Sequence, residues 1–255
     1  NFARLGAGNI EVVCSSAEEY LAQEGLRFDW IYADPDRRSA EGRRQVRLEA
    51  CSPDILALGP LIGRASERLC VKNSPLFDTD EALRLFPRSR VEAVSVGGEC
   101  KEVVIYADGA GPLLTASAIG LGEFSARPGE AAPEPGAFNP ARCRWLVVPD
   151  VALQKARLAR LHLAEKAAIW SENGYGFAAE RPEGVLGRIL EIDRIEPYDP
   201  ARLKRELKGR GAEILKRDFP LRPEELYRRL GLHPGGEVRL AFTKTGNDFW
   251  AIRLK

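Results

Sequence analysis

Hydrophobic and polar positions over the first 108 residues alternate between strand-like runs and helix-like spacing. Apolar runs predict strands at 10–14, 28–33 and 68–72. Helical spacing and capping residues predict helices that begin at Ser16, Ser52 and Asp80. Two further β-rich runs, 91–96 and 102–107, flank Gly97 and Gly98 and predict an antiparallel pair. This order of elements is typical of an α/β sheet.

The hydrophobic pattern decays over 109–142, where five prolines and several glycines interrupt it. Such a composition predicts a linker or an irregular crossing, and we expect a domain boundary within it. Helical spacing returns over 151–168. The histidine of this helix, His162, lies between two leucines, which favours a packed or surface residue over a catalytic one.

The last seventy or so residues form a separate pattern of strands and helices. Strands are predicted at 188–195, 212–216, 237–243 and 249–254, and helices at 200–207 and 223–230. The order β-α-β-α-β-β is close to that of a ferredoxin-like unit. The sequence therefore predicts an α/β fold with a partial Rossmann-like sheet over 1–108, a linker and intermediate α+β segment over 109–185, and a small α+β ferredoxin-like domain over 186–255.

Charge is balanced over the whole chain but not along it. Lys and Arg total 38 against 37 Asp and Glu, a net charge of +1, which does not favour a bulk polyanion binder. From Leu186 onward, sixteen basic residues face eleven acidic ones. This excess is equally typical of a solvated helix face and of a surface that follows phosphates. The candidate RNA-binding residues are Arg202, Lys204, Arg205, Lys208, Lys216 and Arg217.

The spacing of the cysteines and the hydropathy of the chain argue against several classes of protein. Five widely spaced cysteines without a C-x-x-C motif indicate neither a disulfide framework nor a metal site, and we expect most of them to be reduced core residues. No signal peptide and no apolar run long enough to cross a bilayer is found, so we expect a cytoplasmic protein without a membrane partner. The chain begins with Asn1 and contains no methionine, which is typical of a trimmed or processed piece.

The strongest candidate for a site follows the strand predicted at 28–33. This apolar run stops at Asp34, Pro35, Asp36, Arg37 and Arg38. In open α/β sheets, ligands bind in the crevice beyond the carboxyl ends of the strands. The turn is therefore the first place to look for catalytic groups.

Several short motifs occur in a fixed order along the chain. They are Asn1-Phe2, Gly8-Asn9-Ile10-Glu11-Val12, Ala17-Glu18-Glu19-Tyr20-Leu21, the turn after Ile31, Cys51-Ser52-Pro53-Asp54, Val71-Lys72-Asn73-Ser74-Pro75, Glu99-Cys100-Lys101-Glu102 and Lys216-Arg217-Asp218-Phe219-Pro220. This series resembles the later part of a class I S-adenosylmethionine-dependent methyltransferase of the bacterial group that carries a THUMP-like C-terminal domain.

The resemblance implies that the turn holds the target amine or base. Asp34 would position the acceptor and Pro35 would shape the turn, and Arg37 and Arg38 would complete the catalytic group. Amine methyltransferases place a second proline and an aromatic residue after this proline, where the chain has Asp36 and Arg37. Arg37 could stack on a base or pair with phosphate, or it could brace the end of the sheet.

The resemblance also implies S-adenosylmethionine as the cofactor. Its adenine side would meet Ser15, Ser16 and Ala17, although Ser16 is better explained as a helix cap. The glycine-rich loop and the ribose-binding acid of the family are not in the sequence. We therefore expect this chain by itself to bind the cofactor poorly.

Three functions remain open on the sequence. The first is a methyltransferase that acts on an exocyclic amine or base of RNA, either tRNA or rRNA. The second is a non-catalytic RNA-binding or assembly protein on a decayed methyltransferase scaffold. The third is a small-molecule methyltransferase, which the basic C-terminal region disfavours unless its arginines are paired with its own acids.

Overall fold

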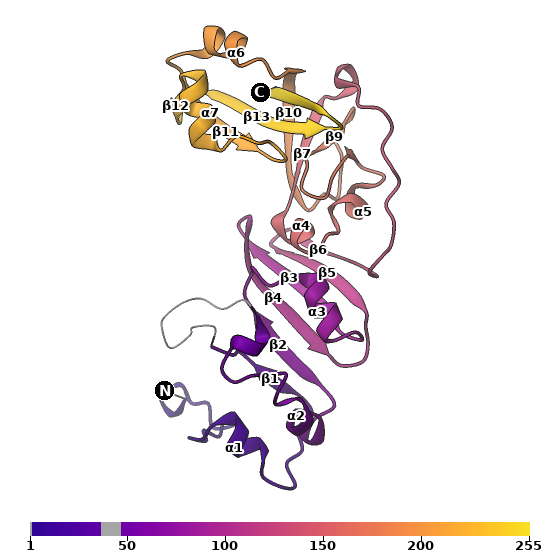
Figure 1. Ribbon diagram of the computed structural model, residues 1–255, viewed down its shortest axis with the longest axis vertical. Helices are drawn as coiled ribbons and strands as arrows, with labels where there is room; N and C mark the ends of the chain where they lie inside the picture. The colour runs from indigo at the N-terminus through magenta and orange to yellow at the C-terminus, as the bar shows by residue number, and fades with distance from the viewer. Residues whose placement is uncertain (1, 37–46) are drawn as a thin grey trace.

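The computed structural model describes residues 2–36 and 47–255 and contains two mixed β-sheets (Figure 1). The first sheet has the strand order β1-β2-β4-β3-β5-β6. Its strands are β1 (Ile31–Ala33), β2 (Leu69–Asn73), β3 (Arg90–Val96), β4 (Glu99–Ala107), β5 (Leu113–Ile119) and β6 (Gly122–Ala126). β1 is parallel to β2, β3 is parallel to β5, and β4 is antiparallel to both β2 and β3. The strands β1, β2, β3 and β5 therefore end at the same edge of the sheet.

Short helices pack on one face of this sheet. They are α1 (Ala17–Leu21), α2 (Gly59–Ala65), α3 (Thr79–Leu85), α4 (Val151–Lys155) and α5 (Ala159–Leu163). Three 3-10 turns, at Ala3–Leu5, Leu48–Ala50 and Pro140–Arg142, are also found, and only the second contributes a residue, Leu48, to the core of this sheet. Alternate strand residues such as Val71, Val91 and Ile105 are fully buried and share one hydrophobic core with Ile62 of α2 and Leu153 of α4. Burial of this stripe of β-branched side chains fixes the strand register.

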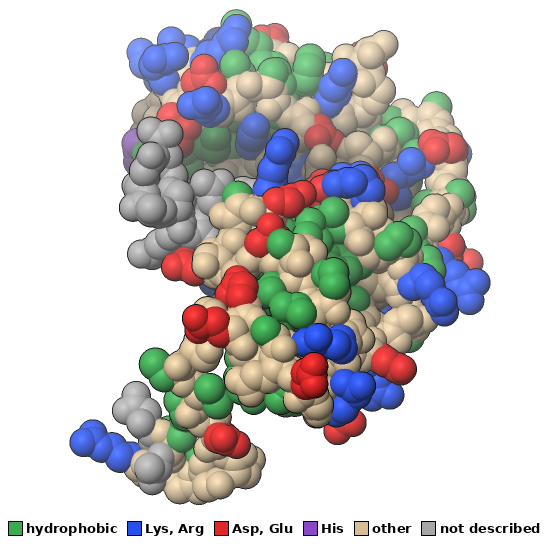
Figure 2. All heavy atoms as spheres, turned by 60° about the horizontal axis from the view of Figure 1, so that its bottom comes forward, with side chains coloured by type: hydrophobic (Ala, Val, Ile, Leu, Met, Phe, Trp, Pro, Cys, Tyr) green, Lys and Arg blue, Asp and Glu red, His purple; other side chains and the backbone are tan. Residues whose placement is uncertain are grey.

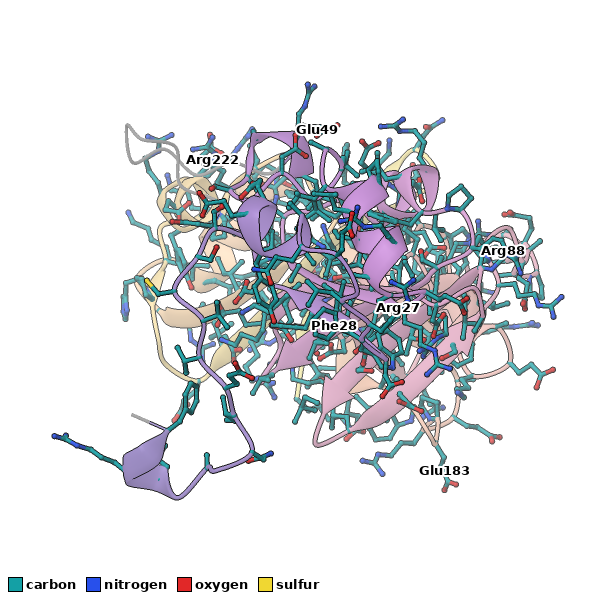
Figure 3. All side chains as sticks on the ribbon, turned by 90° about the horizontal axis from the view of Figure 1, so that it is seen from below. Arg27, Phe28, Glu49, Arg88, Glu183 and Arg222 are labelled. Carbon is teal, nitrogen blue, oxygen red and sulfur yellow. The ribbon has the colours of Figure 1, made fainter. Side chains whose placement is uncertain are left out.

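The strand predicted at 10–14 is absent. These residues form no strand, and the segment before α1 extends away from the sheets (Figures 2 and 3). A strand needs a neighbour for its backbone groups. In the part of the chain that the structure describes, β1 pairs with β2 alone, so its other edge is open. The strand predicted at 28–33 forms over Ile31–Ala33. The prediction that it is buried is wrong for the same reason, because Phe28, Trp30 and Tyr32 remain 38%, 39% and 61% exposed.

The helix predicted to begin at Ser52 begins later, at Gly59. Ser52 instead forms a β-bridge with Asp36. The Asp54 carboxylate caps the following turn by accepting hydrogen bonds from the amides of Leu56 and Ala57 at 3.0 and 3.1 Å. Other local predictions are confirmed: Ser16 forms a capping box with Glu19 at the start of α1, and β3 and β4 pair around the Gly97-Gly98 turn.

The segment 109–142 is only partly irregular. Its residues Leu113–Ile119 and Gly122–Ala126 form β5 and β6 and extend the first sheet beyond β3. The apolar positions of β5 alternate with small polar ones, and Ala116 is fully buried. The irregular part therefore comes after this hairpin, and the domain boundary proposed within 109–142 stays a prediction.

The helix predicted over 151–168 is two helices. α4 and α5 are separated at Arg157, whose φ of 56° lies in the left-handed region and ends the first helix. His162 of α5 is packed, as expected, with 6% of its surface exposed. Its Nε2 accepts a hydrogen bond from the Leu186 amide at 3.0 Å.

His162 makes the fold sensitive to acid. Burial, and to a smaller extent the Lys166 charge, lowers the pKa of His162 from 6.5 to about 4. Because the unfolded chain takes up the proton first, stability is complete above pH 6.5 and is lost as the pH falls from 6.5 towards 4. We expect unfolding free energies at pH 7 and pH 4.5 to differ by about 2 kcal/mol more in the wild type than in His162→Gln. If chemical denaturation gives the same difference between the two pH values for the wild type and for His162→Gln, the assignment of this acid sensitivity to His162 is contradicted.

The second sheet has eight strands in the order β12-β11-β13-β14-β10-β7-β9-β8. They are β7 (Trp145–Pro149), β8 (Ala168–Ile169), β9 (Gly176–Ala178), β10 (Gly187–Pro197), β11 (Gly211–Lys216), β12 (His233–Pro234), β13 (Val238–Thr245) and β14 (Asp248–Leu254). The helices α6 (Pro200–Leu207) and α7 (Pro223–Leu230) contact each other and pack on the strands.

The predicted order of the C-terminal strands and helices is confirmed, but their topology is not that of a ferredoxin-like unit. In a split β-α-β unit one strand lies between the two parallel strands. Here two strands, β13 and β14, lie between β10 and β11. The sheet also continues through β7, β9 and β8, which come from the segment before residue 187.

Candidate functional site

Asp34 and Lys72 meet at the carboxyl edge of the first sheet. Asp34 follows the last residue of β1, and Lys72 lies near the end of β2, because Ala33 pairs in parallel register with Val71. The Lys72 Nζ donates a hydrogen bond to the Asp34 Oδ2 at 2.6 Å. The side chains are 44% exposed for Asp34 and 31% for Lys72, so the pair faces solvent.

The ion pair leaves Asp34 able to accept another donor. The hydrogen bond to Asp34 raises the pKa of the Lys72 ammonium above its ordinary value. A carboxylate offers about four acceptor positions on two oxygens, and Lys72 uses Oδ2. An exocyclic amine at this edge can therefore donate to the same carboxylate while Lys72 holds it in place.

The sequence-based prediction missed Lys72 as a site residue. Two signals point to it in retrospect. Asp34 and Lys72 each stand at the end of a strand-like run, and the carboxyl ends of neighbouring parallel strands meet at one edge. Opposite charges at two such ends predict an ion pair, provided that the strands are adjacent.

The backbone fixes the turn that carries Asp34. Pro35 is buried, and the backbones of Asp36 and Ser52 exchange two hydrogen bonds of 2.7 and 3.0 Å. This two-bond bridge ties the turn to the segment before α2. Arg37 and Arg38 lie outside the described residues, so their catalytic role stays a prediction.

Two of the three predicted cofactor-binding residues, Ser15 and Ser16, form hydrogen bonds with Glu19 at the start of α1. The Ser16 Oγ accepts from the Glu19 amide at 3.1 Å, and the Glu19 carboxylate accepts from the Ser15 hydroxyl and the Ser16 amide at 3.2 and 3.4 Å. Ala17 has no side-chain polar group and offers only its backbone. The role of Ser15, Ser16 and Ala17 in binding S-adenosylmethionine stays a prediction.

The six predicted RNA-binding residues fall into two groups. Lys204, Arg205 and Lys208 are exposed on α6 or directly after it and form no ion pair with a carboxylate among the residues that the structure describes. Arg202, by contrast, pairs with Glu196 and Glu206 at 3.0 Å each. Basic side chains gather on the part of the molecule that holds these C-terminal elements (Figure 2).

The other two predicted residues lie at the end of β11. The Lys216 Nζ donates to the Phe219 carbonyl at 3.0 Å. The Arg217 guanidinium is half-buried and donates to the Pro149 carbonyl at 2.9 Å, so it does not belong to the solvated surface. Burial lowers the pKa of Arg217 from its ordinary value.

Known proteins resemble both parts of the chain. Residues 187–255 match the THUMP domain-like family model. Two curated proteins of Mycobacterium tuberculosis, from strains CDC 1551 and H37Rv, are each 30% identical over 226 residues, which is 85% of this chain and 60% of theirs. Both are named as uncharacterized S-adenosylmethionine-dependent methyltransferases.

A solved structure shares the fold. The crystal structure of an inferred methyltransferase from Porphyromonas gingivalis W83 superposes with a TM-score of 0.71 and 22% identity, covering 89% of this chain and 59% of that one. The chain thus spans about three fifths of the length of these relatives. It belongs to the S-adenosylmethionine-dependent methyltransferase family, and its own C-terminal residues match a THUMP-like domain.

The cysteines and the helices add two further findings. The five cysteines, all within the described ranges, form no disulfide; Cys51 is buried and Cys14 is exposed, so the prediction that most are core residues is wrong. None of the helices found in residues 2–36 and 47–255 is long and apolar enough to cross a bilayer.

Proposed function

We propose that the protein is the acceptor-binding part of an S-adenosylmethionine-dependent methyltransferase that acts on an exocyclic amine or base of RNA. The observation that supports this most is the solvent-facing Asp34 carboxylate, held by Lys72 at the carboxyl edge of the sheet. Family membership and the THUMP-like region support the methyltransferase assignment and the RNA partner respectively.

Positioning is the main contribution of this site. Asp34 accepts a hydrogen bond from the acceptor amine and directs the lone pair of its nitrogen outwards, and the turn around Pro35 sets the height of the carboxylate above the sheet. The cofactor supplies an electrophilic methyl group when it is bound. Holding two reactants in one geometry can account for a large share of the rate. The side chains of Ser15 and Ser16 are hydrogen-bonded to Glu19, so other groups would supply most of the polar contacts to the cofactor.

The exposed basic residues of α6 should contribute to RNA affinity. We expect Lys204→Gln, Arg205→Gln and Lys208→Gln together to weaken binding and to reduce the slope of log affinity against log salt by about 2, because each lost contact with a single strand removes about 0.7. Fluorescence anisotropy with a labelled RNA oligonucleotide at several salt concentrations measures both. Arg202→Gln is the control, since Glu196 and Glu206 already neutralise this charge. A triple variant with the affinity and slope of the control would contradict the prediction.

A non-catalytic RNA-binding protein is the second candidate function. The capping interactions of Ser15 and Ser16 favour it, because they leave few polar groups for a cofactor on this segment. Calorimetric titration of the full-length protein with S-adenosylmethionine separates the two functions. Binding in the range of other methyltransferases supports the enzyme, and no heat of binding supports the non-catalytic protein.

The structure gives little support to the third candidate function, a small-molecule methyltransferase. Several C-terminal arginines do pair with acids of the same domain, such as Arg194 with Glu206 and Arg239 with Glu213. Lys204, Arg205 and Lys208, on α6 or directly after it, form no ion pair with the described residues and can bind a polyanion.

A further inference from the structure

A hollow of about 550 Å³ lies where the two sheets meet. The turn after β3, with Gly97 and Gly98, and the turn after β5, with Gly120, form one wall. The start of α4 and the first residues of β10 form the other wall, and Arg188 and Arg217 both line the space. The residues that line the hollow belong neither to the turn that carries Asp34 nor to α6.

Arg217 is a partly buried cation without a carboxylate partner. Its Nη2 donates to the Pro149 carbonyl at 2.9 Å, its Nη1 lies 3.4 Å from the Gly174 carbonyl, and its guanidinium lies 5.5 Å from the centre of the Tyr175 ring. These contacts orient the group but do not neutralise it. Within the described part of the chain, no Asp or Glu oxygen lies within 4.0 Å of it. A buried charge is costly unless a counter-ion accompanies it.

Arg188 adds a second positive charge to the same space. It is exposed, it lies near the start of β10, and its charge is close enough to lower the pKa of Arg217 further. The acid that lines the hollow, Asp150, is 7% exposed and caps α4, with its Oδ1 accepting from the Ala152 amide at 2.9 Å and from the Ser95 hydroxyl. Asp150 offsets part of the charge, and so does Asp218, which does not line the hollow and accepts from the Ser171 hydroxyl. The lining itself holds two guanidinium groups against one carboxylate.

The hollow shares an edge of the first sheet with the acceptor turn. Val96 and Ile119, the last residues of β3 and β5, are paired in parallel register, and both strands end on the side where Asp34 follows β1. Because β2 and β4 lie between β1 and β3, three strand spacings, about 14 Å, separate the two sites across the sheet. The strand register places Asp34 level with Glu92, four residues before Val96, so the sites are also about 13 Å apart along the strands and about 20 Å apart in all. A strand of RNA that places one base at Asp34 can therefore bring a phosphate a few nucleotides away to Arg188 and Arg217.

We propose that this hollow binds a phosphate group through Arg188 and Arg217. The proposal rests on the proposed function in one respect, namely that the phosphate belongs to the backbone of the bound RNA. A phosphate matches the site because guanidinium groups donate to two phosphate oxygens at once and tolerate partial burial better than ammonium groups. It also adds negative charge to that of Asp150 and Asp218, neither of which lies within ion-pair distance of Arg217.

The first arm of the test measures RNA. We expect Arg188→Gln to weaken binding of a single-stranded RNA oligonucleotide by about tenfold, the scale of one charge-assisted contact, and to lower the salt slope by about 0.7. Arg142→Gln is the matched control, because Arg142 is exposed, forms no ion pair with the described residues and does not line the hollow. Arg217→Lys, which keeps the charge but loses the planar fork, should also weaken binding. Its melting temperature is measured alongside, because the variant also loses the hydrogen bond to the Pro149 carbonyl.

The second arm uses inorganic phosphate without RNA. Phosphorus NMR line broadening of phosphate should be present in the wild type and Arg142→Gln and should be lost in Arg188→Gln. If broadening depends on Arg188 but RNA affinity does not, the site takes the phosphate of a small molecule, and the phosphate site itself is supported. If Arg188→Gln matches Arg142→Gln in both arms, the proposal is overturned. Neither arm measures methyl transfer, so failure of the proposed enzymatic activity is detected separately.

Discussion

Replacing Phe242 by alanine is expected to lower the free energy of unfolding of the region that holds the second sheet by about 3–5 kcal/mol. Phe242 of β13 is fully buried, and its ring lies 5.8 Å from that of Tyr198 and 5.4 Å from that of Phe219, centre to centre. The substitution removes this packing and leaves a cavity among rigid neighbours. Guanidinium denaturation, followed by the fluorescence of Trp170 and Trp250, measures the loss.

Phe249→Ala is the matched control for Phe242→Ala. Phe249 is the same residue type on the next strand and contacts Phe219 at 5.4 Å, but it is 37% exposed. We expect it to cost about 1–2 kcal/mol, because less surface leaves water on folding. Equal losses in the two variants would contradict the proposed core. The same aromatic cluster holds Phe219, two residues after Arg217, so Phe242→Ala should also weaken phosphate binding at the hollow.

Local signals in the sequence predicted local structure correctly. Whereas the helix predicted at Ser52 begins only at Gly59, the capping box at Ser16 and the hairpin at Gly97 and Gly98 were predicted from neighbouring residues. Each depends on groups within a few positions of one another. Their geometry is therefore independent of the rest of the fold.

Non-local pairing was the part that the sequence did not reveal. The apolar run at 10–14 has strand composition but forms no ladder in the described chain, whereas β5 forms one by pairing with β3 from twenty residues away. The C-terminal element order was correct, yet strand order depends on which edges meet. That information lies in tertiary contacts and not in periodicity.

Only part of the candidate site was predicted, because the rest also depends on non-local pairing. Asp34 stands out because it ends an apolar run before a proline, but its partner Lys72 is identified only by the register of β1 and β2. A count of charges also cannot separate Arg202, which is paired with acids, from Arg217, which is partly buried, and from Lys204, which is exposed. Only the fold distinguishes these three environments.

Replacing Asp34 by alanine is expected to reduce methyl transfer by the full-length protein at least about 100-fold, the scale of a misplaced reactant. The acceptor amine loses the carboxylate that orients it, and Lys72 loses its ion-pair partner. Cofactor affinity should remain nearly unchanged, because Asp34 lies on the acceptor side. Asp34→Asn keeps one carbonyl oxygen as an acceptor, so we expect part of the activity to return in that variant.

Single-turnover transfer of a labelled methyl group to RNA, at saturating cofactor, tests the acceptor site most directly. Asp29→Ala is the control, since Asp29 is an exposed acid just before the other end of β1. We predict wild-type turnover for Asp29→Ala, at least about a 100-fold loss for Asp34→Ala and equal cofactor affinity in both. Turnover of Asp34→Ala equal to that of Asp29→Ala would contradict the role of Asp34 and the location of the acceptor site.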